Sequence, residues 1–370
     1  MIEVIRAEGE KLLSAFIHLP FEIYKEDPFF SPLLIKDQKV YLSEENPFFR
    51  LEDVRLYIAM RDGKVVGRIA AIINHRHISI HNERTGFFGL FESINDRAVA
   101  GALLERVATD LKDAGLQLMR GPMNLSTNEE CGFLLEGFQY PPMLLTPYNP
   151  PYYNELMESY GLRKSKDLFA YIADIPPELN EKVNRIAEIA DKRGIRVRKV
   201  DMNRLEDDLL MFKLIYNEAW KDNWGFIPFE DDEIRFMAHQ LKSIIVPELM
   251  LIAHYKDEPV GFLGLIPDYN VVLRVMKGKL NPLSLLKAIF AMRKVKGLRL
   301  LLLGIRPGFR QRGVDALLFR EGFKEVKRRG FKKVEFSWIL EDNIQVQRLV
   351  EMAGGVLYKK FRIYEKDLTF

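Results

Sequence analysis

The feature that most constrains the fold of this 370-residue chain is an internal repeat, because the same signals occur in the same order in each half. Two short β-rich runs joined by a turn predict a hairpin at 57–72 and again at 251–266. A helical pattern follows and ends in a glycine, Gly115 or Gly330. Each half then has an asparagine twelve residues before a glycine and a further strand with a tyrosine, namely Asn149, Gly161 and Tyr171, and Asn343, Gly355 and Tyr364.

The repeat predicts two mixed α/β domains, since strands alternate with helices in each half. The join falls near Pro176 and Pro177, and an amphipathic helical pattern follows over 179–194. We therefore expect one domain over 1–175 and a second over 176–370, each built on a mixed sheet.

Composition excludes several classes of protein. Lys and Arg total 55 against 52 Asp and Glu, and the net charge of +3 is too small for a general nucleic-acid binder. The single cysteine, Cys131, excludes an intrachain disulfide and is expected to be a buried apolar residue rather than a nucleophile. No targeting segment and no apolar run of 18 residues is visible, so we expect a cytoplasmic protein.

Two further features of the sequence bear on whether the protein binds a metal or a nucleotide. His75, His77 and His81 could place two imidazoles on one face of a strand, but no carboxylate or thiol group completes the set nearby, so we expect no metal site. The glycine motifs of Rossmann and P-loop nucleotide sites are absent from the sequence.

The most informative segment for chemistry is a basic loop between a strand and a helix. The apolar run 300–305 predicts a buried strand, the loop covers 306–313, and a helical pattern begins at about Val314. The first N–H groups of a helix have no intrahelical acceptor, and the helix dipole favours an anion beside them. Arg310 and Arg312 add positive charge, so the segment predicts a diphosphate site.

The run Ile305-Arg306-Pro307, followed by Arg310-Gln311-Arg312-Gly313, resembles the acyl-CoA signature of the GNAT (Gcn5-related N-acetyltransferase) superfamily. Residues 343–355 resemble that family's later Asn…Glu-x-x-Gly segment. The resemblance covers 250–370 and is weaker over 55–175. In the first half, the segment 95–101 is the nearest counterpart of the phosphate loop but lacks its pattern. The chain thus resembles a tandem GNAT protein with a degenerate first domain. It implies acetyl-CoA or a longer acyl-CoA as co-substrate, bound by Ile305, Arg310, Gln311, Arg312, Gly313, Val314, Ala316 and Asn343.

The resemblance also implies an N-acyltransferase, in which a base takes a proton from an amine acceptor. The candidate catalytic residues are Glu335, Glu341 and Tyr364. The structural alternatives are a solvated strand position for Glu335 and, for Asp342 and Asn343, a helix cap.

Two positions depart from the family pattern. Asp315 replaces a small residue, and the family's usual tyrosine acid falls at Val350, which leaves Tyr358 and Tyr364 as candidate replacements. These departures favour the alternative of a catalytically inactive GNAT-fold protein that binds a ligand or a partner.

Two polar segments are candidates for the acceptor site. The aromatic segment 217–226 lies where the family's first helices line the acceptor, and a glycine-flanked polar stretch lies at 124–130. The alternatives are an aromatic packing corner and a capped turn. We expect substrate binding by Trp220, Asn223, Trp224, Asn128 and Glu129.

The insertion 268–297 combines a broad apolar helical surface with lysines and arginines. This composition suits a membrane-surface helix over 280–297 or a cover for an acyl chain, and equally a core helix with snorkelling lysines. With the C-terminal segment, it resembles bacterial tandem GNAT-like proteins, some of which are linked to sphingolipid N-acylation. The resemblance implies a small-molecule or lipid amine acceptor, such as a sphingoid base, and a cytoplasmic protein peripheral at the inner membrane surface.

Overall fold

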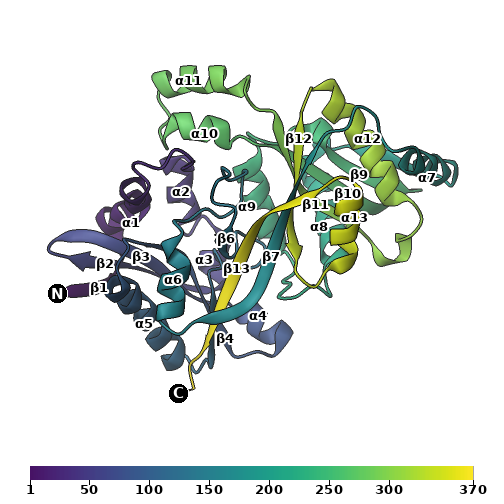
Figure 1. Ribbon diagram of the computed structural model, residues 1–370. Helices are drawn as coiled ribbons and strands as arrows, with labels where there is room; N and C mark the ends of the chain where they lie inside the picture. The colour runs from purple at the N-terminus through teal and green to yellow at the C-terminus, as the bar shows by residue number, and fades with distance from the viewer. Residues whose placement is uncertain (370) are drawn as a thin grey trace.

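The computed structural model describes residues 1–369, and its first half alternates strands with helices (Figure 1). The strands are β1 (Ile2–Arg6), β2 (Asp53–Arg61), β3 (Lys64–Ile73), β4 (Thr85–Ser93), β5 (Leu118–Gly121), β6 (Phe133–Glu136) and β7 (Arg163–Asp174). The helices are α1 (Gly9–Ile23), α2 (Ile35–Tyr41), α3 (Pro47–Leu51), α4 (His75–His81), α5 (Arg97–Asp113) and α6 (Tyr152–Ser159).

The second half repeats this alternation. Its strands are β8 (Ile195–Lys199), β9 (Met250–Tyr255), β10 (Glu258–Pro267), β11 (Gly297–Ile305), β12 (Lys333–Leu340) and β13 (Val356–Asp367). Its helices are α7 (Glu181–Lys192), α8 (Leu205–Ala219), α9 (Asp231–Leu241), α10 (Asn270–Met276), α11 (Pro282–Met292), α12 (Val314–Arg328) and α13 (Ile344–Met352). The antiparallel pairs β2–β3 and β9–β10 confirm both predicted hairpins.

One sheet runs through both halves because their last strands are exchanged. Its order is β1-β2-β3-β4-β5-β13-β7-β12-β11-β10-β9-β8, with β6 paired to β13 beside this path. The C-terminal strand β13 lies between β5 and β7 of the first half, and β7 in turn pairs with β12 of the second. Figure 1 shows β13, in yellow, beside β7 along the middle of the molecule.

Both faces of the second half's sheet are covered by helices. Along β9, Leu251 and Ala253 pack with residues of α7 and α12, whereas Met250 and Ile252 pack with residues of α8 and α9. This alternation is expected of a strand with both faces buried. The basic loop follows β11 and leads into α12, so it lies at the edge of this sandwich.

Two segments differ from the simplest expectations. His75, His77 and His81 belong to a helix, α4, because Asn74 caps it by accepting a hydrogen bond from the backbone N–H of His77 (2.8 Å). Within residues 1–369, no cluster of His, Cys, Asp and Glu side chains is arranged to hold a metal ion. The insertion forms two helices, α10 and α11, and none of the described helices has the length and apolarity needed to cross a bilayer.

Candidate active site

The second half contains a slot where two parallel strands separate. Strands β11 and β12 pair only from Gly297–Lys333 to Leu300–Phe336. Beyond that point β12 has an irregular register between Phe336 and Ile339, while β11 continues to pair with β10 as far as Ile305. Over 301–305, β11 therefore has no strand neighbour on its β12 side among the described residues, which leaves backbone groups for a ligand.

The basic loop lies at the end of this slot and presents unpaired backbone donors. Gly313 adopts a left-handed conformation (φ 81°) and forms the N-cap of α12, and no side chain caps this helix. Across residues 1–369, no protein group accepts a hydrogen bond from the backbone N–H groups of 311–316. Unpaired amides at the positive end of a 15-residue helix form an anion site.

The side chains of the loop do not fill this site, although Gly313 itself is buried against Ile186 and Ala190 of α7. Arg310 donates to the backbone oxygen of Ala219 (2.9 Å), and the Arg312 guanidinium lies over the Phe309 ring (5.0 Å); both arginines are exposed. Asp315 is also exposed and, in the part of the chain that the structure describes, makes no hydrogen bond to the loop. Its carboxylate therefore does not fill the predicted diphosphate site.

The first half has lost both of these features. Strands β4 and β5 separate after Phe87–Arg120, but the following segment fills the gap: the N–H of Met123 donates to Phe88 O (2.8 Å), and the side chain of Asn124 accepts from Leu90 N (2.9 Å). The N-terminus of α5, which corresponds to that of α12, is capped by Asp96, whose carboxylate accepts from the N–H groups of 98 and 99. The slot and the anion site are therefore properties of the second half.

A buried polar cluster lies where β11 and β12 separate. The Glu335 side chain is fully buried, and it accepts hydrogen bonds from the hydroxyls of Ser337 and Tyr358. Arg299, which is 2% exposed, lies opposite Glu335 on β11, donates to Ser337 Oγ (2.8 Å) and is 3.8 Å from the Glu335 carboxylate. A buried carboxylate beside a protonated hydroxyl can accept a proton through that hydroxyl.

The first half supplies the backbone that covers this cluster. Arg299 donates to the carbonyl oxygens of Leu144 and Leu145, and Lys359 donates to that of Pro141 (2.6 Å). Burial lowers the pKa of Lys359 to about 8. Burial, together with the Glu335 carboxylate, raises the pKa of Tyr358, so this hydroxyl stays protonated.

The structure does not bring together all the residues predicted to act in catalysis. Glu341 accepts from Lys164 (2.5 Å) and from the N–H of Asp167, so it joins β12 to β7. Tyr364 is buried in the core of the first half, where its hydroxyl donates to Asn154 (2.8 Å), because the exchange carries β13 into that sheet. Asn343 caps α13 by accepting from the N–H of 346 (3.3 Å).

The residues predicted to bind substrate lie where the two halves meet. Asn128 accepts from the Tyr216 hydroxyl (2.8 Å) and donates to Ile227 O (3.1 Å), so both ends of its amide are used. The ring of Trp220 stacks on Tyr216 and lies against Gly304 of β11, beside the slot.

The other predicted residues of this group take different positions. Trp224 lies against Arg120 and Lys166, and Asn223 donates its backbone N–H to the carbonyl of Trp220. Glu129 is half-buried, and burial with Glu130 nearby raises its pKa to about 8. Of the whole group, Trp220 is thus the residue that packs directly on β11.

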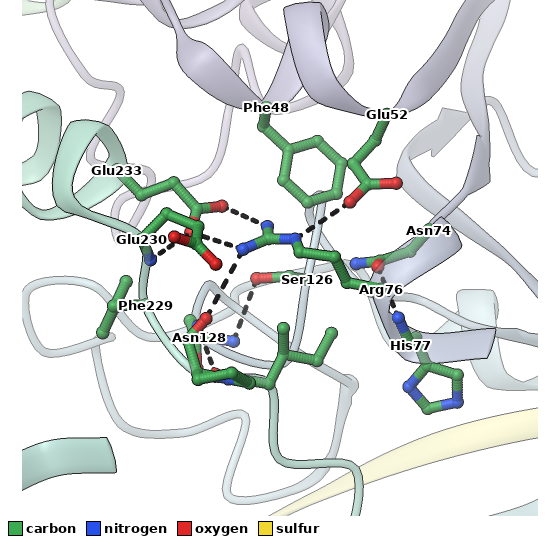
Figure 2. A network of polar contacts seen from close by, with 12 residues as sticks. Phe48, Glu52, Asn74, Arg76, His77, Ser126, Asn128, Phe229, Glu230 and Glu233 are labelled. Atoms are coloured by element: carbon green, nitrogen blue, oxygen red, sulfur yellow. Dashed lines mark hydrogen bonds and ion pairs between the residues drawn. The ribbon is translucent and has the colours of Figure 1, made fainter. Parts of the chain in front are cut away.

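Arg76 reinforces the same contact between the halves, and sequence reasoning missed it. Figure 2 shows Arg76 reaching from α4 to Glu233 of α9, with Glu52 on its other side (3.0 Å). The sequence does contain a clue to Arg299, because it is an isolated charged residue in the apolar run that forms β11. Lys359 had none, because its neighbours Lys360 and Arg362 are also charged.

Comparison with known proteins identifies related chains. The acetyltransferase (GNAT) family model matches residues 210–354. A bacterial ceramide synthase of Caulobacter vibrioides is 34% identical over 99% of this chain and 98% of its own length. Protein YghO of Escherichia coli is 31% identical over 96% of this chain and 93% of its own. A solved tandem GNAT protein from the clavulanic acid biosynthesis pathway covers 100% of this chain and 99% of its own (TM-score 0.58, 11% identity), which shows the shared fold.

Proposed function

The chain belongs to the GNAT acetyltransferase family and is an N-acyltransferase, and from this premise we propose that it transfers a long acyl group from CoA to a sphingoid base. A ceramide is the amide of a sphingoid base, and the relative named bacterial ceramide synthase aligns along almost the whole chain. The product of the proposed reaction is therefore a ceramide-type amide together with free CoA.

The observation that carries this proposal is the row of unpaired N–H groups over 311–316 beside Arg310 and Arg312. Amides at a helix N-terminus and guanidinium groups are suited to a diphosphate such as that of CoA. We assign the pantetheine arm to the free edge of β11 and the diphosphate to the loop. The proposed contacts come from Ile305, Arg310, Gln311, Arg312, Gly313, Val314 and Ala316, whereas the side chain of Asn343 is used in capping α13.

We assign the acid–base chemistry to Glu335 and Tyr358. The amine must lose a proton to attack the thioester, and Glu335 accepts it through the Tyr358 hydroxyl that already donates to it. The new N–C bond forms as the C–S bond breaks, and the thiolate of CoA takes a proton back from the same hydroxyl. Arg299 forms a buried ion pair with Glu335 at 3.8 Å. Trp220 lines the acceptor side of the slot through its contact with Gly304.

The lipid acceptor is supported by an apolar surface on α11. Leu283, Leu286, Ile289 and Phe290 are between 52% and 62% exposed, and lysines and arginines flank them in the sequence. A helix with a basic border and an exposed apolar face binds at the headgroup level of an anionic membrane. We propose that the protein works in the cytoplasm and contacts the inner membrane surface through 280–297.

The function is tested by incubating the purified protein with a long-chain acyl-CoA and sphinganine. The amount of amide measured by mass spectrometry should equal the amount of free CoA measured by thiol titration. Glu335→Gln should lower kcat by roughly 100-fold or more while acyl-CoA still stabilises the protein against heat. If the wild type is stabilised by acyl-CoA but acylates no long-chain amine, the assigned acceptor is wrong.

The membrane contact is tested with Leu286→Glu and Ile289→Glu by co-sedimentation with anionic vesicles. We expect the double variant to lose binding. The matched control is Leu210→Glu, which changes a residue of α8 that is 47% exposed. Equal binding by wild type and double variant would contradict this surface.

A further inference from the structure

A second cavity lies in the first half, on the other side of the backbone that covers Arg299. Its volume is about 170 Å³, which is room for about five water-sized groups. It lies between the end of α1, strands β3 and β4, and the segment 142–148, and Asn270 of α10 also lines it. Aromatic rings of Phe21, Tyr24 and Phe30 form part of its wall. We call it the head-group cavity.

The cavity contains a buried cation with unused donors. Arg68 is 8% exposed and carries five N–H donors. Within residues 1–369 its hydrogen bond goes from Nη1 to the backbone oxygen of Phe16 (2.8 Å), and its Nε has no partner. Its Nη2 is 3.7 Å from Glu92, which is too long for a hydrogen bond. A buried guanidinium with free donors is costly unless a ligand or water accepts from it.

The carboxylates of the cavity exceed its cations. Glu92 accepts from the hydroxyls of Tyr24 (2.9 Å) and Tyr153 (2.6 Å) and lies opposite Arg68. Glu130 also lines the cavity, and its hydrogen-bond partner in the described chain is Asn124 at 3.5 Å. Burial raises the pKa of both Glu92 and Glu130, so a positively charged ligand that stabilises their ionised forms is favoured. The free donors of Arg68 require an acceptor on the same ligand.

The cavity borders the backbone that covers Arg299 and lies near the connection between α10 and α11. Leu144 and Leu145 line the cavity, and their carbonyl oxygens accept hydrogen bonds from Arg299. Burial raises the pKa of Glu130, and the nearby charge of Arg299 offsets only part of this rise. On the opposite side, Leu33 lines the cavity and is 44% exposed, and the nearby Ile35 donates its N–H to Gly278 O (2.9 Å), between α10 and α11.

We propose that the head-group cavity binds the hydroxyl-bearing part of the head of a long-chain amino alcohol, with Arg68 donating to a hydroxyl group and Glu130 attracting the ammonium group on the side toward Arg299 and the slot. This inference rests on the proposed function and specifies how its acceptor is recognised. The hydrocarbon chain leaves past Leu33 toward α11. The enzyme therefore selects an amine that carries hydroxyl groups over a plain alkylamine of equal length.

The test compares sphinganine with octadecylamine at saturating acyl-CoA. We expect the wild type to prefer sphinganine in kcat/KM by roughly 10-fold or more, because a charged donor would otherwise be left unpaired. Arg68→Met should bring this preference close to one while octadecylamine is still acylated. The matched control is Arg61→Met, since Arg61 pairs with Asp96 on the same half but does not line the cavity.

Two variants keep the test decisive if Arg68→Met does not fold. Glu130→Gln should raise KM for both amines by roughly 10-fold with KM for acyl-CoA unchanged. Ser31→Phe adds a ring to the cavity wall without removing a charge, and it should raise KM for both amines with KM for acyl-CoA unchanged. Folded variants that keep the wild-type preference and the wild-type amine KM would overturn the cavity assignment. If acyl-CoA stabilises the wild type but neither amine is acylated, it is the proposed function that fails.

Discussion

Replacing Arg310 and Arg312 together with alanine should weaken CoA binding and leave the fold intact. Both side chains are exposed and lie outside the four larger core clusters. The backbone donors of 311–316 remain in the double variant, because they depend on the N-terminus of α12 and on Gly313. The variant therefore separates the guanidinium contribution from that of the helix terminus.

The size of the effect follows from the contacts. A hydrogen bond from a charged donor contributes about 1.5–3 kcal/mol, and a neutral one about 1 kcal/mol. Arg310 gives up its hydrogen bond to Ala219 O when it turns to a phosphate, so its net gain is smaller than that of Arg312. Together the two arginines should contribute about 2–4 kcal/mol, which corresponds to a loss of affinity of roughly 30-fold to several hundred-fold.

Isothermal titration calorimetry with CoA at low and moderate salt measures this loss. The control variant replaces Arg328 and Arg329, at the opposite end of α12, where both pair with Glu325. The control should bind CoA as the wild type does, and the loop variant should also show a weaker dependence of affinity on salt. A loop variant that binds CoA within twofold of the wild type at both salt concentrations would refute the diphosphate assignment.

Three further variants probe the fold around the site. Burial lowers the pKa of Lys359 to about 8, so between about pH 8 and pH 10.5 the folded state binds fewer protons than the unfolded state and the wild type becomes more stable as the pH rises. Lys359→Met should remove this rise. In urea unfolding, the change in the free energy of unfolding across this pH range should differ between the two proteins by at most about 3 kcal/mol. Asp96→Ala should cost about 1 kcal/mol in thermal unfolding and leave CoA affinity unchanged. Gly304→Ala would place a Cβ 2.3 Å from the Trp220 ring, so it should lower the free energy of unfolding by about 1–3 kcal/mol and change the tryptophan fluorescence. The control is Gly308→Ala, whose Cβ meets no atom within 4 Å and which should change neither stability nor fluorescence.

Much of the local structure was predictable from short-range patterns. The apolar run at 300–305 became the end of β11, the helix expected at Val314 begins there, and Gly115 and Gly330 both end helices with positive φ. These features depend on residues a few positions apart, which is why periodicity and capping rules identify them.

The exchange of β7 and β13 was not predictable in the same way. Both strands have twelve residues and a similar alternation of buried and more exposed side chains. Either strand could therefore form backbone hydrogen bonds with the edge of β5 or of β12. The choice depends on pairing between residues almost 200 positions apart, such as Tyr171 with Leu357. The place of Tyr364 in the first-half core follows from that choice, and so does the meeting of Tyr358 with Glu335.

The exchanged sheet explains how a half without a slot of its own contributes to the buried polar cluster beside the slot of the other half. Tyr358 reaches Glu335 because β13 crosses into the first half beside β7, which pairs with β12. Arg299 and Lys359 are buried, and carbonyls of 141–145 accept hydrogen bonds from both of them. Leaving either group unpaired would cost about 1–3 kcal/mol or more. In the proposed mechanism the first half thus completes the acid–base cluster from outside the slot, and the proposed acceptor cavity lies in the half that has no CoA site of its own.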